Sequence, residues 1–354
     1  MDDPPSVIVL SALTALVLWT RRTWAAGLML AIAAASLAAP STASAGLVSD
    51  LLRDDVPFVN RSVWIVSSRN APNIADCCST VFGHAAAECY RAPTGCLEVY
   101  RRDPCGCLHR RCFTDLLATI DPSKPTVIFT HGSFITWDYY RRECPRTAEW
   151  LERAAGRELN VIFFAWPSDG ALPTCAAAVR VRERIARTYS FYMAELLRML
   201  PPQQPGCPTV LASHSHGGEM MSATLHLLAG GAIGRKRLAC PPSVRPRALL
   251  FAPAMDSNDF NPGQAFDRAL CATPAMAIIY SDKDIANRLY PLRRPLAGLS
   301  IGRTGLRNCD ARKIGPRARR VSNVDLTRSI GCTHIWAAYL DRDFIGRTLR
   351  PYFN

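Results

Sequence analysis

From residue 60 onward, short apolar runs alternate with longer segments in which apolar and polar residues repeat at helical spacing. Several of the short runs are almost continuously apolar and rich in β-branched and aromatic residues, which is typical of parallel strands buried on both faces. They predict strands at about residues 62–67, 96–100, 125–130, 160–166, 208–213, 247–252, 275–280 and 320–325.

The clearest helix is predicted over residues 176–200, where Val181, Ile185 and Tyr189 lie on one apolar stripe. Strands and helices in alternation indicate an α/β fold, with a doubly wound, mostly parallel sheet that helices cover on both faces. No internal repeat or linker interrupts the pattern, so residues 46–354 are expected to form a single domain. Further helices are predicted at about 143–156, 217–229, 285–290 and 334–349.

The composition is that of a folded protein, because 49% of the 354 residues are hydrophobic and 20% are charged. Basic residues outnumber acidic ones 42 to 29. The chain nevertheless lacks the interleaved basic and aromatic pattern of a nucleic-acid-binding module and a glycine-rich phosphate loop. We therefore expect neither a nucleic-acid partner nor a cofactor.

One basic cluster, formed by Arg312, Lys313, Arg317, Arg319 and Arg320, lies between two of the predicted strands. A solvated loop is the simpler interpretation of such a charge run. The alternative is a surface for an anionic substrate, a lipid headgroup or a polysaccharide.

The first 45 residues contain two apolar runs, at 7–19 and 24–39, and neither reaches the roughly 20 residues that span a bilayer. The arginine pair at positions 21 and 22, the second run and the small residues up to Ala45 predict a secretory signal peptide that is cleaved after Ala45. The alternatives are an uncleaved membrane anchor and a degraded twin-arginine signal. We expect an exported protein whose membrane contact is confined to residues 1–45.

Fourteen cysteines, seven of them between Cys77 and Cys112, indicate a cysteine-rich elaboration of the domain at about residues 70–115. An even number of cysteines in an exported protein predicts disulfides, up to seven here. Zinc binding is the alternative for one group of ligand-type residues, whose spacing lacks the paired C-x-x-C form of common zinc sites. We therefore expect no metal at this group, which consists of Cys105, Cys107, His109 and Cys112.

The strongest chemical signal follows the predicted strand 208–213, where Ser215 stands in the run Ser-His-Ser-His-Gly-Gly just before a predicted helix. A serine on a sharp turn between a strand and a helix is typical of a nucleophile elbow, G-x-S-x-G. Here Ser213 stands in place of the first glycine, so a small side chain is kept. The alternative is that Ser215 only caps the following helix.

A second loop, His131-Gly132-Ser133, follows the predicted strand 125–130. In a site of this kind, such a loop supplies one main-chain N–H of an oxyanion hole, and the residue after the nucleophile supplies the other. These are Ser133 and His216, and Gly132 would let the main chain approach the substrate closely. An ordinary strand-to-helix turn is the alternative.

The order of such triads along the chain is serine, acid, histidine, so both partners of Ser215 are expected downstream. His226 falls inside the helix that begins at the elbow, which leaves His334 as the expected base. Asp284, after the strand 275–280, is the expected acid. Asp256 and Asp282 are the alternatives.

Taken together, these motifs resemble a bacterial, esterase/lipase-like branch of the α/β-hydrolase superfamily that is largely of unassigned function. The resemblance covers about residues 64–349 and includes the segments FFAWPS, SHSHG, FAPAMDSNDF and YSDKD and the late G-x-x-H. It implies Ser215 as nucleophile, Asp284 as acid and His334 as base. Two features depart from it: His216 replaces the apolar residue usual after the serine, and the cysteine-rich insert is not a general family feature.

The expected function is therefore that of an exported serine hydrolase that cleaves a carboxylic ester or similar acyl bond through an acyl-enzyme. Its substrate would be a small-molecule or lipid acyl compound, with an anionic one among the possibilities that the basic cluster raises. The alternative is a catalytically inactive α/β-hydrolase scaffold that binds a component of the cell envelope.

Overall fold

The computed structural model describes residues 59–72, 88–169, 176–294 and 297–354. The predicted signal peptide or anchor at residues 1–45 lies outside these ranges. Within them, no helix combines the length and the apolar character that crossing a bilayer requires.

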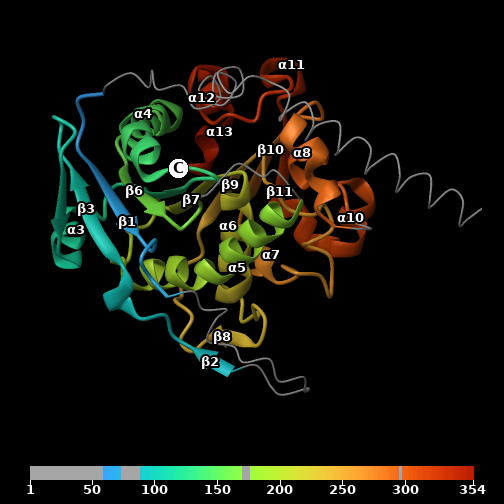
Figure 1. The fold of residues 1–354 in the computed structure, drawn as a ribbon, viewed down its shortest axis with the longest axis horizontal. Coiled ribbons are helices and arrows are strands. Elements are labelled where there is room, and N and C mark those ends of the chain that lie inside the picture. Colours follow the sequence, from blue (N-terminus) through green and yellow to red (C-terminus); the bar gives the residue numbers. More distant parts are fainter. Residues whose placement is uncertain (1–58, 73–87, 170–175, 295–296) are drawn as a thin grey trace, which may run out of the picture. The chain divides into compact units, whose positions relative to one another are not determined.

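Nine strands form one sheet in the order β11-β10-β9-β7-β5-β6-β1-β3-β4 (Figure 1). All neighbours are parallel except β3, which runs antiparallel to both β1 and β4. The predicted fold class, a mostly parallel sheet in an α/β fold, is confirmed. The strands are β1 (Val63–Ser67), β3 (Glu98–Arg102), β4 (Leu108–Arg111), β5 (Thr126–Thr130), β6 (Asn160–Ala165), β7 (Thr209–His214), β9 (Arg247–Phe251), β10 (Met276–Tyr280) and β11 (Val321–Asp325).

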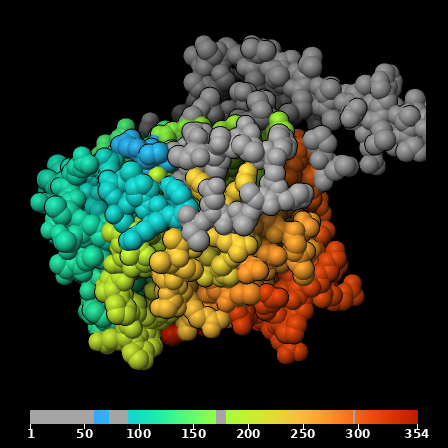
Figure 2. Space-filling model, turned by 90° about the horizontal axis from the view of Figure 1, so that it is seen from below, coloured from blue at the N-terminus to red at the C-terminus, as the bar shows by residue number. Residues whose placement is uncertain are grey.

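All eight predicted strands are present, with ends shifted by no more than two residues. The sequence pattern did not predict β4 or the small parallel sheet of β2 (Glu88–Tyr90) and β8 (Lys236–Leu238). These strands are only three or four residues long and contain charged residues, so they carry no apolar run. Figure 2 shows the face on which the segments of β2, in cyan, and β8, in yellow, lie side by side.

Alternate side chains of the central strands enter two separate apolar cores, one on each face of the sheet. Phe129 and Phe251 belong to the core that α4 (Trp137–Ala155), α12 (Ala337–Leu340) and α13 (Asp343–Leu349) cover. Ile128 and Leu250 belong to the core under α5 (Ala176–Met199), α6 (His216–Leu228) and α7 (Ala269–Ala272) (Figure 1). Helices therefore cover both faces, as expected.

The carboxyl ends of β5 and β7 meet at the point where the chain changes direction across the sheet. From β5 the chain goes to β6 on one side, and from β6 it crosses to β7 on the other side of β5. Such a switch point is where open α/β sheets place their binding crevices.

Two helix predictions need correction. The helix predicted at 143–156 begins at Trp137, because the Thr136 hydroxyl accepts a hydrogen bond from the Tyr139 N–H and caps an earlier start. The helix predicted at 334–349 is two helices, α12 and α13. The turn between them lets side chains of both pack into the same core. The remaining short helices are α3 (Phe113–Thr119), α8 (Ile285–Leu289), α9 (Ile301–Thr304), α10 (Asn308–Ile314) and α11 (Thr327–Ile330).

The expectation of disulfides is not confirmed where it can be examined. The ten cysteines whose side chains the structure describes are all unpaired, and they include Cys144 and Cys207 in the interior. The side chains of the other four lie outside the described parts. The proposed zinc ligand His109 is instead bonded to Asp103 at 3.0 Å, and the described residues contain no group of three potential metal ligands.

Glu143 on α4 provides a test of the core around that helix. Its carboxyl is 3% exposed, and neither oxygen has a hydrogen-bond partner among the described residues. Burial raises the pKa of Glu143 from 4.5 to about 7. The unfolded chain therefore loses this proton at a lower pH than the folded protein does. The free energy of unfolding consequently falls as the pH rises from 4.5 to 7. We expect Glu143→Gln, which mimics the protonated group, to raise the free energy of unfolding by about 1–3 kcal/mol at pH 8.

At pH 4 the same substitution should change little, since the wild-type carboxyl is then protonated in both states. Urea denaturation of both proteins at the two pH values measures the difference. An equal effect of Glu143→Gln at pH 4 and pH 8 would contradict the expectation.

Candidate active site

Ser215 lies on a sharp turn between β7 and α6. Its backbone has φ 55° and ψ −127°, a conformation that costs free energy for any residue other than glycine. Two glycines make the turn possible by bringing α6 close to neighbouring loops. A Cβ at Gly217 would lie 2.7 Å from the His131 carbonyl oxygen, and one at Gly218 would lie 2.7 Å from the Pro253 Cβ.

Three side chains distant in sequence meet at the carboxyl ends of the strands. The Oγ of Ser215 lies 2.9 Å from His334 Nε2, and His334 Nδ1 lies 2.7 Å from an oxygen of Asp284. Asp284 is fully buried, Ser215 is 7% exposed and the His334 side chain is 20% exposed. The three residues come from the ends of β7 and β10 and from the segment after α11, so the structure brings together the trio expected from the sequence.

Asn287, which the sequence analysis did not single out, holds the carboxylate of Asp284. Its main-chain N–H and its side-chain amide each donate to one Asp284 oxygen at 3.0 Å. The amide is itself held by the Ala252 carbonyl and by the hydroxyl of Ser300. The signal in the sequence was an aspartate followed three residues later by asparagine at a helix start, which is also an ordinary capping pattern.

The two alternative acids lie elsewhere. Asp282 is exposed, and only its main chain forms hydrogen bonds in the described structure. Asp256 is buried but binds Arg293 at 2.8 Å and also pairs with Arg294. The other downstream histidine, His226, lies near the far end of α6, where its Nε2 contacts the Ala232 N–H and its Nδ1 faces the Arg268 N–H and the Asp267 carboxylate.

The loop after β5 lies directly against the serine. A Cβ at Gly132 would be 2.8 Å from the Ser215 Cβ, so only glycine allows this approach. The Phe134 N–H donates to the Ser168 carbonyl at 2.7 Å and is therefore occupied. The N–H groups of Ser133 and His216 bind no acceptor in the described residues, since the former lies in a turn and the latter begins a helix.

Three further histidines surround the trio and are held neutral by burial. The pKa of both His131 and His216 is lowered to about 3, mainly by burial, and at His216 the nearby His334 and arginines contribute to this lowering. Burial, with a contribution from His334, also lowers the pKa of His214, whose ring lies 4.9 Å from that of His334. These three rings therefore add no positive charge beside the trio.

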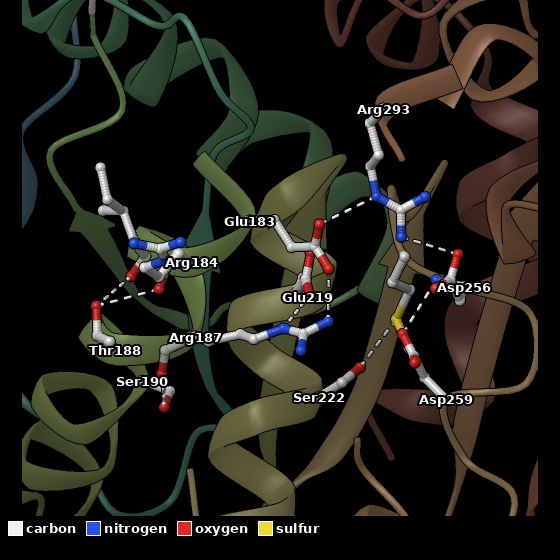
Figure 3. Close-up of polar contacts among 12 residues, drawn as sticks. Glu183, Arg184, Arg187, Thr188, Ser190, Glu219, Ser222, Asp256, Asp259 and Arg293 are labelled. Carbon is white, nitrogen blue, oxygen red and sulfur yellow. Dashed lines mark hydrogen bonds and ion pairs between the residues drawn. The ribbon is translucent and has the colours of Figure 1, made fainter. Parts of the chain in front are cut away.

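A buried network of charged side chains lies behind His216. Arg187 on α5 pairs with Glu183 at 2.7 Å and with Glu219 of α6 at 2.5 Å. Arg293 pairs with Glu183 at 3.0 Å and with Asp256 (Figure 3). The two arginines therefore tie α5, α6 and the segments after β9 and α8 together around the start of α6.

The basic cluster at residues 312–320 lies at the opposite end of the sheet from the trio. It occupies α10 and the 3-10 turn that leads into the amino end of β11. Within it, Arg320 donates to the main-chain carbonyls of Leu270 and Thr273. The cluster therefore does not border the trio, and its interpretation as a surface for an anionic partner stays a prediction.

The neutral state of the buried histidines can be measured by NMR of ring carbons and nitrogens across a pH series. Because burial disfavours the charged imidazolium, we expect the signals of His131 and His216 not to titrate between pH 5 and pH 8. Assignment by His131→Gln and His216→Gln identifies the two signals. A midpoint between pH 6 and pH 7 for either residue would contradict the burial argument.

Neither a family model nor a curated protein sequence matches the chain. Among solved structures it is similar to esterase B from Lactobacillus rhamnosis, solved with a tributyrin phosphonate, at a TM-score of 0.42 and 12% identity over 92% of this chain and 94% of that one. It is also similar to an esterase from Pyrobaculum calidifontis, with a TM-score of 0.37 and 14% sequence identity over 99% of this chain and 98% of that one. Carboxyl esterase 2 of Tuber melanosporum has a TM-score of 0.33 and 15% sequence identity to it, over 92% of this chain and 98% of that one. TM-scores this low support no argument about activity.

The topology itself is informative. A mostly parallel sheet carries a strained serine after one strand, an aspartate after a later strand and a histidine after the last strand. This order, with a glycine-containing loop beside the serine, is the α/β-hydrolase arrangement. The predicted fold class, a doubly wound, mostly parallel sheet with helices on both faces, is confirmed by the sheet and its two cores.

Proposed function

We propose that the protein is a serine hydrolase that cleaves a carboxylic ester or similar acyl bond. The observation that carries the proposal is the continuous relay from Ser215 Oγ through His334 to the buried carboxylate of Asp284, with contacts of 2.9 and 2.7 Å. An imidazole that touches a hydroxyl on one side and a carboxylate on the other can accept the hydroxyl proton.

The proposed reaction has two half-reactions. His334 Nε2 accepts the proton of Ser215 as Oγ attacks the acyl carbonyl, and the N–H groups of Ser133 and His216 bind the negative oxygen. Asp284 keeps the Nδ1–H of His334 pointed toward itself and stabilises the imidazolium. His334 then gives its proton to the leaving alcohol, which leaves the acyl group on Ser215. In the second half-reaction His334 accepts a proton from water as the water attacks this acyl group, and it returns the proton to Ser215 Oγ as the acid is released.

The strained backbone of Ser215 supports the same role. A residue held at positive φ without being glycine persists only where its surroundings over-determine it, and such residues cluster at functional sites. A serine that merely capped α6 would need no such strain, and Ser215 makes no side-chain cap hydrogen bond. No metal or organic cofactor is part of the proposed mechanism, and a small-molecule or lipid acyl ester is the proposed substrate class.

A fluorophosphonate probe and a short-chain 4-nitrophenyl ester test the proposal. We expect the probe to label the wild type and not Ser215→Ala, and kcat for the ester to fall about 10⁴-fold in His334→Ala and Asp284→Asn. Asp282→Asn is the matched control, because it removes an exposed carboxylate two residues away. It should keep kcat within about threefold, as surface changes usually do.

If folded wild-type protein neither reacts with the probe nor hydrolyses any ester, the proposed hydrolase is refuted in favour of an inactive binding scaffold. If Asp282→Asn lowers kcat as much as Asp284→Asn, the assignment of the acid is wrong.

We further propose that the protein is exported and that its signal peptide is cleaved after Ala45. The proposal rests on the short apolar run of residues 24–39 and on the small residues at 43–45. N-terminal sequencing of protein recovered from cell fractions should find Gly46 first. Ala45→Phe should block cleavage, while Ser44→Phe, at a position that signal peptidases do not read, should not. Recovery of the uncleaved wild-type chain from membranes would indicate an anchor instead.

A further inference from the structure

Arg182 on α5 lies beside the loop that approaches Ser215. Its guanidinium carbon is 5.6 Å from the ring centroid of Phe134, which follows Ser133 and has a positive φ of 63°. The positive charge of Arg182 also contributes to the lowered pKa of His216. The guanidinium therefore lies near both segments that flank the reactive serine, the loop after β5 and the start of α6.

Arg182 differs from its neighbours because it has no acidic partner among the described residues. Arg187 and Arg293 share Glu183 and bind Glu219 and Asp256 in addition, so each of these carboxylates already pairs with an arginine, although the second oxygen of Glu219 has no hydrogen-bond partner among the described residues (Figure 3). The Nε of Arg182 is buried and donates to no acceptor in the part of the chain that the structure describes. Burial lowers the pKa of Arg182, and no carboxylate opposes this effect. A donor that is enclosed without an acceptor costs free energy until a ligand compensates for it.

Other hydrogen-bonding groups near His216 and Phe134 also lack partners. They are the Ser133 hydroxyl, the Tyr290 hydroxyl and the Nε2 of His216, all of them buried. The rings of His216 and Tyr290 are 5.8 Å apart, and the guanidinium of Arg293 lies 3.6 Å from the Tyr290 ring centroid. The guanidinium can only donate and each hydroxyl can donate one hydrogen bond, so this set can bind an acceptor-rich group carried by a ligand.

We propose that Arg182 is a specificity-determining residue that binds an anionic group, a carboxylate in the first instance, on the ester that Ser215 attacks. The inference rests on the proposed hydrolase function and names its substrate class. A guanidinium with a free Nε–H forms charge-assisted hydrogen bonds with a carboxylate, and these are stronger than bonds between neutral groups. The neutral imidazole of His216 beside it adds no charge that would offset this attraction.

Matched pairs of esters test the proposal. 4-Nitrophenyl hexanoate and the 4-nitrophenyl monoester of adipic acid differ only by a carboxylate at the end of the acyl chain. Phenyl hexanoate and 4-carboxyphenyl hexanoate differ by a carboxylate on the leaving alcohol. For each pair the measured quantity is the ratio of kcat/KM for the anionic ester to kcat/KM for the neutral one.

Arg182→Gln should lower this ratio about 10- to 100-fold in at least one pair, because hydrogen bonds to charged groups contribute that much. The pair affected tells whether the anionic group belongs to the acyl chain or to the alcohol. Arg182→Lys keeps the charge and should retain part of the preference. Arg184→Gln is the matched control: it removes an exposed arginine from the same helix and should leave both ratios within about twofold, as expected for a screened surface charge.

Failure of the inference and failure of the proposed function are distinguishable. If the wild type hydrolyses neutral esters through Ser215 but Arg182→Gln changes neither ratio more than Arg184→Gln does, the inference alone is overturned. If no ester is hydrolysed, the inference is tested by calorimetry, which measures the Kd of adipate for Ser215→Ala. A Kd at least tenfold weaker in Ser215→Ala/Arg182→Gln supports an anion site at Arg182, and an unchanged Kd overturns it.

Discussion

The close packing of α6 against the loops after β5 and β9 is the constraint on which the site depends. The strained turn at Ser215 is stable only because Gly217 and Gly218 leave room for the His131 carbonyl and for Pro253. The same closeness brings Gly132 against Ser215, next to the N–H groups of Ser133 and His216, which have no acceptor among the described residues. Any side chain at these glycines would push apart the segments that define the site.

Around this turn, polar groups are buried in two different ways. On one side, His131, His214 and His216 are buried as neutral rings, which avoids the cost of dehydrating a cation. On the other side, the buried Arg293 and the partly buried Arg187 carry charges that carboxylates compensate. The interior next to the serine is therefore polar and yet excludes most water, a setting in which each hydrogen bond to a reacting group is electrostatically stronger than in bulk solvent.

Much of the architecture could be predicted from the sequence because the central strands are nearly pure apolar runs. The residues that react also stood out, since the order of serine, acid and histidine along the chain left few candidates. The supporting residues could not be predicted in this way. Glu183 and Arg187 lie on a helix whose charged residues resemble a solvated face, and only the packing of η3 (Tyr290–Arg293) over that helix buries them. Asn287 likewise resembles an ordinary helix-capping residue.

The charge run at residues 312–320 stands out in the sequence but lies away from the site. Its density is conspicuous in the sequence, but the direction of β11 places it at the amino ends of the strands. The unpaired Arg182, a single arginine within a helix rich in arginine, carries no distinguishing sequence signal. Its difference from its neighbours emerges only when the carboxylates that they share are known.

The trio and Arg182 also belong to different parts of the architecture. The spacing of Ser215, Asp284 and His334 depends on the register of parallel strands, which hydrogen bonds along the whole sheet maintain. Arg182 projects from a helix that lies on top of that sheet. Substitutions on the helix can therefore diversify what the protein accepts while the reactive geometry stays constant, so this division makes the scaffold readily evolvable.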